Sequence, residues 1–392
     1  MKNNKPKAVI PFAIAAVLAF FSIAIAACEG DEGLPVVNSV PPPRDEWWKE
    51  IEEGGKMYAD LRYKEVDGKI TIIRYEGEGG SVAIPPEIGG LPVTAIGIHA
   101  FRETKLTDVV IPGSVTSIGD GAFYGMGVLF PDSAYIASEA FGPNRLTSVV
   151  IPDNVTYIGN WAFAYNELAS VIIPGSITSI GNGVFNNNHL ASVVIPDNVT
   201  YIGNWAFAYN VLTSVVIPDS VISIGDGAFD HNRLASVVIP NSVTSIGDWA
   251  FSYNRLASVV IPNSVTSIGD WAFYVNSLTS ITIPDSITRI APCAFNCNQL
   301  TSVVISNSVT SIGFGAFLVN KITFINIPDS VTKIEFRAFQ DNWQLVGITI
   351  GKNVKLEEEA FIPRFVETYN KGGRRAGTYT RPNTNSTVWT KQ

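Results

Sequence analysis

The chain is poor in the side chains that enzymes use for chemistry. Its three histidines, His99, His189 and His231, are isolated from one another and occupy different positions in the surrounding pattern. The sequence contains no G-x-S-x-G, HExxH or phosphate-binding glycine-rich motif, and its many serines have no paired base in the sequence. These absences predict a protein that is not an enzyme and that needs no cofactor.

Cysteine is equally scarce, with Cys28, Cys293 and Cys297 as the three examples. Cys293 and Cys297 lie in the stretch PCAFNC, at positions that other repeats fill mostly with Trp, Gly, Tyr or Asn. An exported protein can pair them as a disulfide. The alternative is two ordinary substitutions in a tolerant turn. Metal binding needs two further ligands beside this pair, and because the repeat offers none we expect no metal site.

Positive charge is also in short supply. The chain carries 27 Lys and Arg against 35 Asp and Glu, which gives a formal net charge of −8. An acidic chain is a poor ligand for nucleic acid, because phosphate binding relies on Lys and Arg. With 16% charged and 46% hydrophobic residues, the composition is nevertheless that of a folded protein.

A long apolar run lies near the N-terminus. Lys2, Lys5 and Lys7 precede the stretch AVIPFAIAAVLAFFSIAIAA, which ends in small residues before Cys28. This order is typical of an export signal, and the junction resembles the bacterial lipobox, in which the cysteine is lipidated. The alternative is a signal anchor kept as a membrane helix, because about 20 residues can span a bilayer. We expect a lipoprotein signal peptide over residues 1–27, lipidation of Cys28 and a flexible tether over 28–43.

An internal repeat dominates the rest of the chain. The nineteen residues RLASVVIPNSVTSIGDWAF occur at 233–251 and again at 255–273. A phenylalanine, preceded by Ala or once by Val, recurs at intervals of 22 residues in eleven cases and of 18 residues in one. These residues are Phe101, Phe123, Phe141, Phe163, Phe185, Phe207, Phe229, Phe251, Phe273, Phe295, Phe317, Phe339 and Phe361. Such a period indicates a solenoid or a similar stacked array, with one irregular turn after Phe123.

Each repeat contains two short extended segments. In LTSVVIPDNVTYIGNWAF, the apolar Leu146, Val149 and Ile151 follow the L-x-x-L-x-L pattern, and the β-branched run before Pro152 predicts a strand. A second extended piece places Ile158 inward. No stretch keeps helical periodicity for long, so we expect the return to be one short helical turn or irregular. A single repeat cannot bury a core, and stacking on its neighbours is therefore required.

Two polar residues recur at fixed places in the repeat. Asn follows the Phe by three positions in ten repeats, from Asn144 to Asn342. Asn tolerates left-handed backbone angles and fits a turn, and a row of identical amides can also bond from turn to turn. Asp226, Asp248 and Asp270 repeat in the IGD turn, where stacked carboxylates suit either turn chemistry or calcium. A calcium-binding nonapeptide pattern is absent, which favours turn chemistry.

The repeat resembles the unit of BspA-like leucine-rich repeats, L-x-x-I-x-I-P-x-x-V-x-x-I-G-x-x-A-F, over residues 81–361. The resemblance implies an α/β-class but β-dominated leucine-rich repeat solenoid. We expect a right-handed superhelix of about 13 turns, with a parallel concave sheet and short helical or irregular return segments.

Residues 44–80, with a hairpin signal at Asp67-Gly68, resemble the N-terminal cap of such arrays, and residues 362–392 resemble a closing strand pair. The resemblance further implies an exported cell-surface or outer-membrane protein. Such a protein adheres to extracellular-matrix, host or neighbouring-cell proteins.

The outward positions of the first strand form one candidate contact surface. A row of serines from Ser148 to Ser302 lies beside a row of mostly aliphatic residues, here called the aliphatic lane. Its candidate contact residues are Val150, Ile172, Val194, Val216, Val238, Val260 and Val304. An exposed apolar strip favours partner binding, although valine also simply suits a strand.

Aromatic residues outside the inward pattern form a second candidate surface. They are Trp161, Trp205, Trp249, Trp271, Tyr165, Tyr209 and Tyr253. Such rings anchor protein interfaces or stack on sugars, and the alternative is that they stack on one another between turns. The sequence therefore favours a lipid-anchored surface protein that binds proteins, with a structural envelope spacer or a carbohydrate binder as alternatives.

Overall fold

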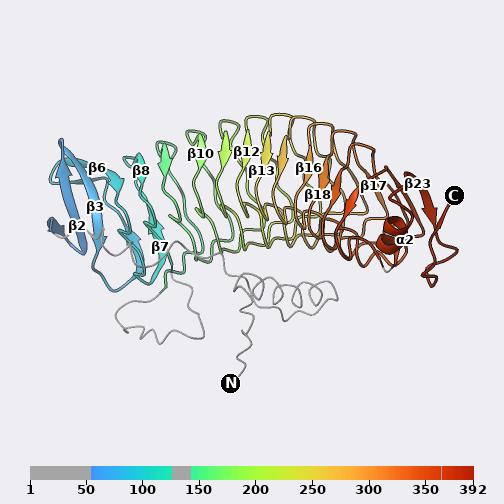
Figure 1. The fold of residues 1–392 in the computed structure, drawn as a ribbon. Coiled ribbons are helices and arrows are strands. Elements are labelled where there is room, and N and C mark those ends of the chain that lie inside the picture. Colours follow the sequence, from blue (N-terminus) through green and yellow to red (C-terminus); the bar gives the residue numbers. More distant parts are fainter. Residues whose placement is uncertain (1–53, 126–142, 363) are drawn as a thin grey trace, which may run out of the picture. The chain divides into compact units, whose positions relative to one another are not determined.

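A computed structural model describes residues 54–125, 143–362 and 364–392 of the chain. In these residues the chain winds into successive coils that contribute short strands to two parallel ladders (Figure 1). The described part contains a single helix, α2 (Phe365–Lys371), close to the C-terminus. None of its helices has the length and hydrophobicity to cross a membrane. The expected signal peptide, Cys28 and the tether lie outside the described residues.

The strands before the regular coils make the N-terminal cap and the first turns. They are β1 (Lys56–Tyr58), β2 (Leu61–Val66), β3 (Lys69–Tyr75), β4 (Gly80–Ala83), β5 (Glu87–Ile88), β6 (Leu91–Ile96), β7 (Leu106–Val110) and β8 (Ser117–Ile118). Strands β2 and β3 pair antiparallel across Asp67 and Gly68, whose φ angles of 52° and 71° suit a tight hairpin. Strand β3 then pairs parallel with β6, so the hairpin covers the first edge of the array.

The more regular ladder is built by the second extended segment of each coil. Its strands are β9 (Tyr157–Ile158), β10 (Ser179–Ile180), β11 (Tyr201–Ile202), β12 (Ser223–Ile224), β13 (Ser245–Ile246), β14 (Ser267–Ile268), β16 (Arg289–Ile290), β18 (Ser311–Ile312), β20 (Lys333–Ile334) and β22 (Lys355–Leu356). Neighbours pair parallel with a 22-residue offset, as Ile202 does with Ile224. The amide of Gly203 lies 2.8 Å from the carbonyl of Ile180, so this ladder is tightly bonded.

The first extended segment is less regular than the sequence predicts. Its strands are β15 (Ser280–Thr282), β17 (Ser302–Val304), β19 (Phe324–Asn326) and β21 (Gly347–Ile350), and isolated parallel bridges join Val110, Val150, Ile172, Val194 and Val216. Amides here lie further from their acceptors, for example 3.3 Å from Thr213 N to Ala191 O. A proline lacking an N–H ends most of these segments, which shortens the ladder.

Phenylalanine rings form the centre of the core. Twelve of them stack along the array with centroids 4.8–5.8 Å apart and ring planes within 17° of parallel. Tyr75 of the N-terminal cap stacks on Phe101 at one end, and Phe365 of α2 meets Phe361 edge-on at the other. The caps therefore continue the same row of rings that the repeats build.

The sequence also predicts a turn at Phe141, and the structure does not describe that residue. Phe123 stacks directly on Phe163 with a centroid distance of 5.3 Å. Strands β8 and β9 also pair with each other. The coils on either side of residues 126–142 are thus immediate neighbours.

The asparagines three positions after the Phe are buried and bond from coil to coil. Asn232 Nδ2 donates to the carbonyl of Phe207 in the preceding coil at 2.9 Å and to that of Phe229 at 3.2 Å, while its Oδ1 accepts from Leu212 N at 3.0 Å. The same set recurs along the array, for example at Asn254. The asparagine therefore bonds both its own coil and the preceding one, which combines the two expected roles.

Left-handed backbone does occur at the coil corners, but at other residues. Positions two before and two after each Phe have φ near 50–60°; they include Trp161, Tyr165, Asn187, Trp205, Tyr209, His231, Trp249, Tyr253, Trp271, Cys293 and Cys297. This geometry costs a non-glycine residue about 1–2 kcal/mol. It aims each corner amide at the next coil, as Trp161 N donates to Asn182 O at 2.8 Å. The return segments are accordingly irregular and not helical.

The C-terminal residues close the array with a helix and two strands. Strand β23 (Gly377–Thr380) pairs antiparallel with β21 of the last coils, and β24 (Thr390–Lys391) pairs with β23. Arg381 donates to the carbonyls of Leu345 and Trp343 at 2.7 and 2.8 Å, which ties the cap to the array. The strand pair matches the sequence expectation, whereas α2 was not predicted.

Candidate interaction surface

The aliphatic lane is exposed to solvent along the array. In the first segment of each coil, side chains alternate, so that Val149 and Ile151 are buried while Val150 between them points outward. The six consecutive lane residues from Val150 to Val260 are each 76–79% exposed. Thr282 and Val304 continue the row, and Val304 is 54% exposed. The candidate residues from sequence therefore lie side by side on one face.

The structure also extends the lane by one residue that sequence reasoning missed. Val110 forms a parallel bridge with Val150 and is exposed. It follows Leu106 by four positions, as Val150 follows Leu146, so the repeat pattern itself held this signal. At the other end Asn326 takes the lane position, and the exposed Phe324 stands where other coils carry the flanking serine.

The residues beside the lane are uncharged, and charges begin only at the edges of the strip. In the eight coils from Leu146 to Ser308, the outward neighbours on one side are Ser and, beyond it, Thr or Ala. One edge then carries Arg145, Arg233, Arg255 and Lys321, together with Glu167. The other edge carries Asp153, Asp197, Asp219, Asp285 and Asp329. The strip is therefore apolar and hydroxylic, with a mainly basic and an acidic margin.

The tryptophans pack against glycines of the following coil. A Cβ placed on Gly183 or Gly227 would collide with the ring of Trp161 or Trp205, so each ring lies over a glycine. Trp161 is buried, and Trp205 is half-buried. The alternation of Trp and Gly at this corner thus provides a seat for each indole, and these two rings serve coil packing.

Where glycine is missing, the ring is displaced outward. Trp249 is followed one coil later by Trp271 instead of Gly, and Trp249 is 39% exposed. It still stacks on Trp205, with centroids 6.3 Å apart. Trp271 meets Tyr274 edge-on at 4.9 Å. Even the most accessible candidate ring therefore has an aromatic neighbour.

The tyrosine row is also self-stacked. His231 lies between Tyr209 and Tyr253, with centroid distances of 4.4 and 4.2 Å and nearly parallel planes. Tyr165 packs tilted against Tyr124 at 5.2 Å. Sugar binding by stacking needs an open ring face, and these contacts occupy ring faces. The aromatic rows support the alternative of stacking between turns.

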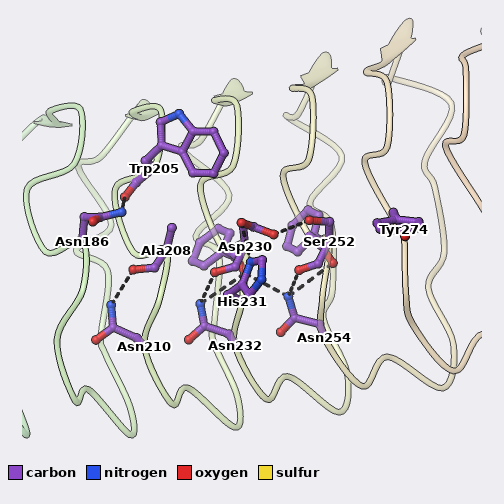
Figure 2. A network of polar contacts seen from close by, with 12 residues as sticks. Asn186, Trp205, Ala208, Asn210, Asp230, His231, Asn232, Ser252, Asn254 and Tyr274 are labelled. Carbon is purple, nitrogen blue, oxygen red and sulfur yellow. Dashed lines mark hydrogen bonds and ion pairs between the residues drawn. The ribbon is translucent and has the colours of Figure 1, made fainter. Parts of the chain in front are cut away.

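A polar network lies behind this row (Figure 2). Asp230 replaces the Ala208 of the preceding coil and is buried; its carboxylate accepts the Ser252 hydroxyl and contacts His231 Nδ1 at 2.7 Å. The carboxylate therefore takes the middle position. Because Ser252 and His231 both engage Asp230, the serine is not placed as a nucleophile on a histidine base.

The Asp and Asn residues of the IGD and IGN turns form a second ladder. From Asp120 to Asp248, each Oδ1 accepts the backbone amide of the next coil, as Asp226 does from Asp248 at 2.9 Å and Asp248 from Asp270 at 2.7 Å. Burial raises the pKa of Asp226 and of Asp270, and the charge of Asp248 raises both further. In the described ranges, no group of three or more His, Cys, Asp or Glu is arranged to hold a metal ion.

Of the two readings of Cys293 and Cys297, the disulfide between them is wrong for this structure. Cys293 is a buried free thiol that lies 3.6 Å from the carbonyl of Phe314 in the next coil. Cys293 lies two residues before Phe295, at the corner where other coils carry Trp, and Cys297 lies two residues after it, at the corner where other coils carry Tyr. Burial raises the pKa of the Cys293 thiol, which makes it unreactive.

Several solved structures are similar to this chain. A leucine rich cell surface protein from Faecalibacterium prausnitzii A2-165 is 26% identical, with a TM-score of 0.52 over 77% of this chain and 90% of that chain. A leucine-rich repeat protein from Bacteroides ovatus ATCC 8483 is 22% identical, with a TM-score of 0.42 over 80% and 96%. The pneumococcal vaccine antigen PcpA is 15% identical, with a TM-score of 0.43 over 82% and 96%.

None of the curated proteins matches this chain. The family model described as BspA type leucine rich repeat region matches residues 94–210, 134–256 and 222–346. Together these ranges span 94–346, which is more than half of the 392 residues. The chain therefore belongs to the BspA type leucine-rich repeat family.

Proposed function

We propose that the chain is a cell-surface protein that binds other proteins through the aliphatic lane. The observation that carries this proposal is the run of six consecutive lane residues, each 76–79% exposed. Contiguous exposed apolar surface is uncommon on soluble proteins and marks contact sites. The similar protein from Faecalibacterium prausnitzii is a cell surface protein, which supports the location.

The strand alone does not require valine at these positions. Thr282 occupies the lane in the coil between Val260 and Val304 and pairs in register with Val304. A β-branched residue with a hydroxyl group therefore fits the same backbone, and it would leave less apolar surface in water. The retention of an aliphatic side chain in the other coils supports a contact role, because burying such a side chain contributes about 1.5–3 kcal/mol.

The attachment and the partners belong to the same proposal. We infer export, lipidation at Cys28 and display on the cell surface or outer membrane, with matrix, host or neighbouring-cell proteins as partners and no role in nucleic-acid binding or catalysis. Fractionation of cells that express Cys28→Ser tests the anchor, since this variant is expected to leave the membrane fraction. Retention of Cys28→Ser in the membrane would instead support the uncleaved signal anchor.

The binding test compares two faces of the same molecule. The triple variant Val194→Ser, Val216→Ser and Val238→Ser removes apolar surface from the lane, and Ile222→Ser does so from the other ladder, where Ile222 is also exposed. Binding of the full chain to matrix proteins and intact cells is expected to fall at least about tenfold in the triple variant only, because tenfold corresponds to about 1.4 kcal/mol. Equal binding by the parent chain, the triple variant and Ile222→Ser would refute the lane as the contact surface.

One observation favours the structural spacer as a second candidate. Residues 233–251 and 255–273 are identical, so two neighbouring coils present the same surface and offer little to distinguish one partner from another. A spacer would show no saturable binding to any of these proteins, while its loss would alter the envelope. Saturable binding that depends on the lane excludes this reading.

A further inference from the structure

The partner of the lane can be deduced from its surroundings, if the lane is a contact surface as proposed above. We propose that it binds a second copy of this chain, with the two arrays side by side and running in the same direction. Each coil of one copy then faces the same coil of the other. The inference deepens the proposed function by naming one partner.

The strip is large enough for such a pair. Eight coils at about 4.8 Å each and a width of five residues at about 3.3 Å cover roughly 600 Å² on each copy. The two copies together would bury about 1,200 Å², which is the lower end of the range for stable protein interfaces. The strip carries no charge across this width, so pairing desolvates hydroxyl groups and aliphatic side chains only.

The margins of the strip determine how a second copy fits. The mainly basic edge includes Arg145 and Lys321, and the acidic edge includes Asp153 and Asp329, eight positions further along the same coils. All four residues are exposed. A partner that presents an acidic edge to the first and a basic edge to the second is complementary on both sides, and a second copy has both edges.

Only one of the two face-to-face symmetries uses this complementarity. A two-fold axis along the array exchanges the two edges, so that at the two ends of the strip Arg145 faces Asp153 of the other copy and Lys321 faces its Asp329. Between these ends, Arg233 and Arg255 face neutral asparagines, and no two like charges meet. A two-fold axis across the array would place the basic edge on the basic edge, and like charges in contact oppose association. The first arrangement keeps both copies in the same direction. Both N-terminal ends then lie together, as two molecules on one cell surface require.

Cysteine crosslinking in the full chain tests both the contact and its direction. Val150→Cys, Val216→Cys and Val304→Cys are introduced singly, and crosslinked dimers are measured on intact cells by non-reducing gel electrophoresis. In the same-direction pair each position faces its own counterpart, so all three variants are expected to crosslink several-fold above Ile222→Cys on the other ladder. The unsubstituted chain controls for its own cysteines.

The other outcomes each overturn a part of the proposal. Mixed dimers between Val150→Cys and Val304→Cys and between Val216→Cys and Val238→Cys, with no dimer of Val150→Cys or Val304→Cys with itself, would show the opposite direction. No crosslinking above the control at any of the three positions would refute the second copy as partner. If the lane variants lose binding to foreign proteins and no crosslinking is seen, the proposed function stands and the second copy is refuted as partner. If crosslinking is seen without binding to foreign proteins, the second copy stands as partner and binding to foreign proteins is refuted.

Discussion

At the scale of single residues, one backbone bond is often made by different side chains in different coils. Asp120, Asn160, Asn182, Asn204 and Asp226 all accept the amide of the next coil through Oδ1. An amide and a carboxylate serve equally as acceptors, but they differ in charge. Asp and Asn can therefore replace each other at this position while the hydrogen bond is kept. An exchange between them measures the effect of the charge alone.

Replacing Asp248 with Asn tests the charge at this ladder. The Asn keeps the 2.7 Å bond to Asp270 N and removes the charge that adds to the raised pKa values of Asp226 and Asp270. Groups with raised folded pKa values contribute stability that is present below the ordinary aspartate value and is lost as pH rises through the raised value. We expect Asp248→Asn to recover a few tenths to about 1 kcal/mol at neutral pH.

Urea unfolding midpoints at several pH values measure this effect. The gain from Asp248→Asn should vanish near pH 3, about one unit below the ordinary aspartate pKa, where the carboxyls are protonated in both forms. The reverse substitution Asn204→Asp, which places a carboxylate one coil before Asp226, should show a smaller midpoint at neutral pH. A gain that is the same at acid and neutral pH would contradict the electrostatic explanation.

The buried amide row is far less tolerant. Asn232→Ala removes three donated bonds and one accepted bond. The carbonyl of Phe207 keeps the bond from Asn210, but the amide of Leu212 is left unpaired in the core. An unpaired buried group costs about 1–3 kcal/mol, so we expect a loss of about 1–3 kcal/mol in unfolding free energy.

A matched asparagine provides the control for this loss. Asn198 also donates to a carbonyl of the preceding coil, Gly175 O at 2.6 Å, but it is exposed, and water can replace it. Asn198→Ala should therefore cost below about 1 kcal/mol. Thermal or urea unfolding compares the two variants, and equal losses would show that burial of the amide row is not what matters.

At the scale of the coil, the corners join backbone strain to side-chain packing. Two positions per coil keep left-handed angles, and in several coils the residue is aromatic and not glycine. Residue propensities do not predict these angles, because the angles are set by a hydrogen bond to the next coil and not by the residue itself. The Trp and Gly alternation is visible in the sequence, and its meaning emerges only once Trp161 is seen to lie over Gly183.

A larger residue at one of the glycines beneath a Trp ring should disturb the coil locally. In Gly227→Ala the new methyl group enters the space of the Trp205 ring, and the left-handed angle of 58° adds backbone strain. We expect a loss of about 2–4 kcal/mol, from overpacking and strain together. Gly175→Ala is the control, because a Cβ at Gly175 meets nothing within 4 Å.

Fluorescence can report the same substitution independently. If Trp205 is pushed outward, its emission should shift toward the red and its quenching by iodide should increase, as expected for a ring as exposed as Trp249. The signal is read against a Trp249→Phe background, because that ring already reaches solvent. Unchanged emission together with unchanged stability would show that the seat can relax.

At the scale of the whole molecule, the direct stacking of Phe123 on Phe163 makes residues 126–143 dispensable for the coil geometry. Their removal joins FYG to NRL, which matches the FAYNEL of the next coil and restores the interval of 22 residues. We expect the deletion to fold with an unfolding free energy within about 1 kcal/mol of the parent, because the coils on both sides already stack directly on each other and chain length between fixed ends changes closure entropy only slightly.

Circular dichroism and urea unfolding of the deletion check this expectation. A control deletion of residues 188–205, which has the same length, removes most of one regular coil and should break the amide row and the ring row. If the deletion of 126–143 unfolded the chain as this control does, the segment would have to be a structural coil after all.

Much of the architecture was predictable because the repeat restates each constraint many times. The spacing of the Phe residues gave the core row, and the alternation around Val150 gave the exposed lane. Single events were not predictable. The direct stacking of Phe123 on Phe163, the helix α2 and the separate corners of Cys293 and Cys297 each occur once, so no periodicity supports them. The asparagine row was expected as turn or ladder, and only the contacts of Asn232 show that it serves both.

Because residues 233–251 and 255–273 are identical, the gene can gain or lose repeats of this kind without changing the contacts between coils. Strands β13 and β14, which these copies contain, pair through the same residues on both sides, Ser245 with Ser267 and Ile246 with Ile268. A gene duplication that adds another such copy would meet only partners the chain already has. The number of coils can therefore grow or shrink by recombination without any compensating mutation, and the length of the array becomes a trait that varies in steps of one coil.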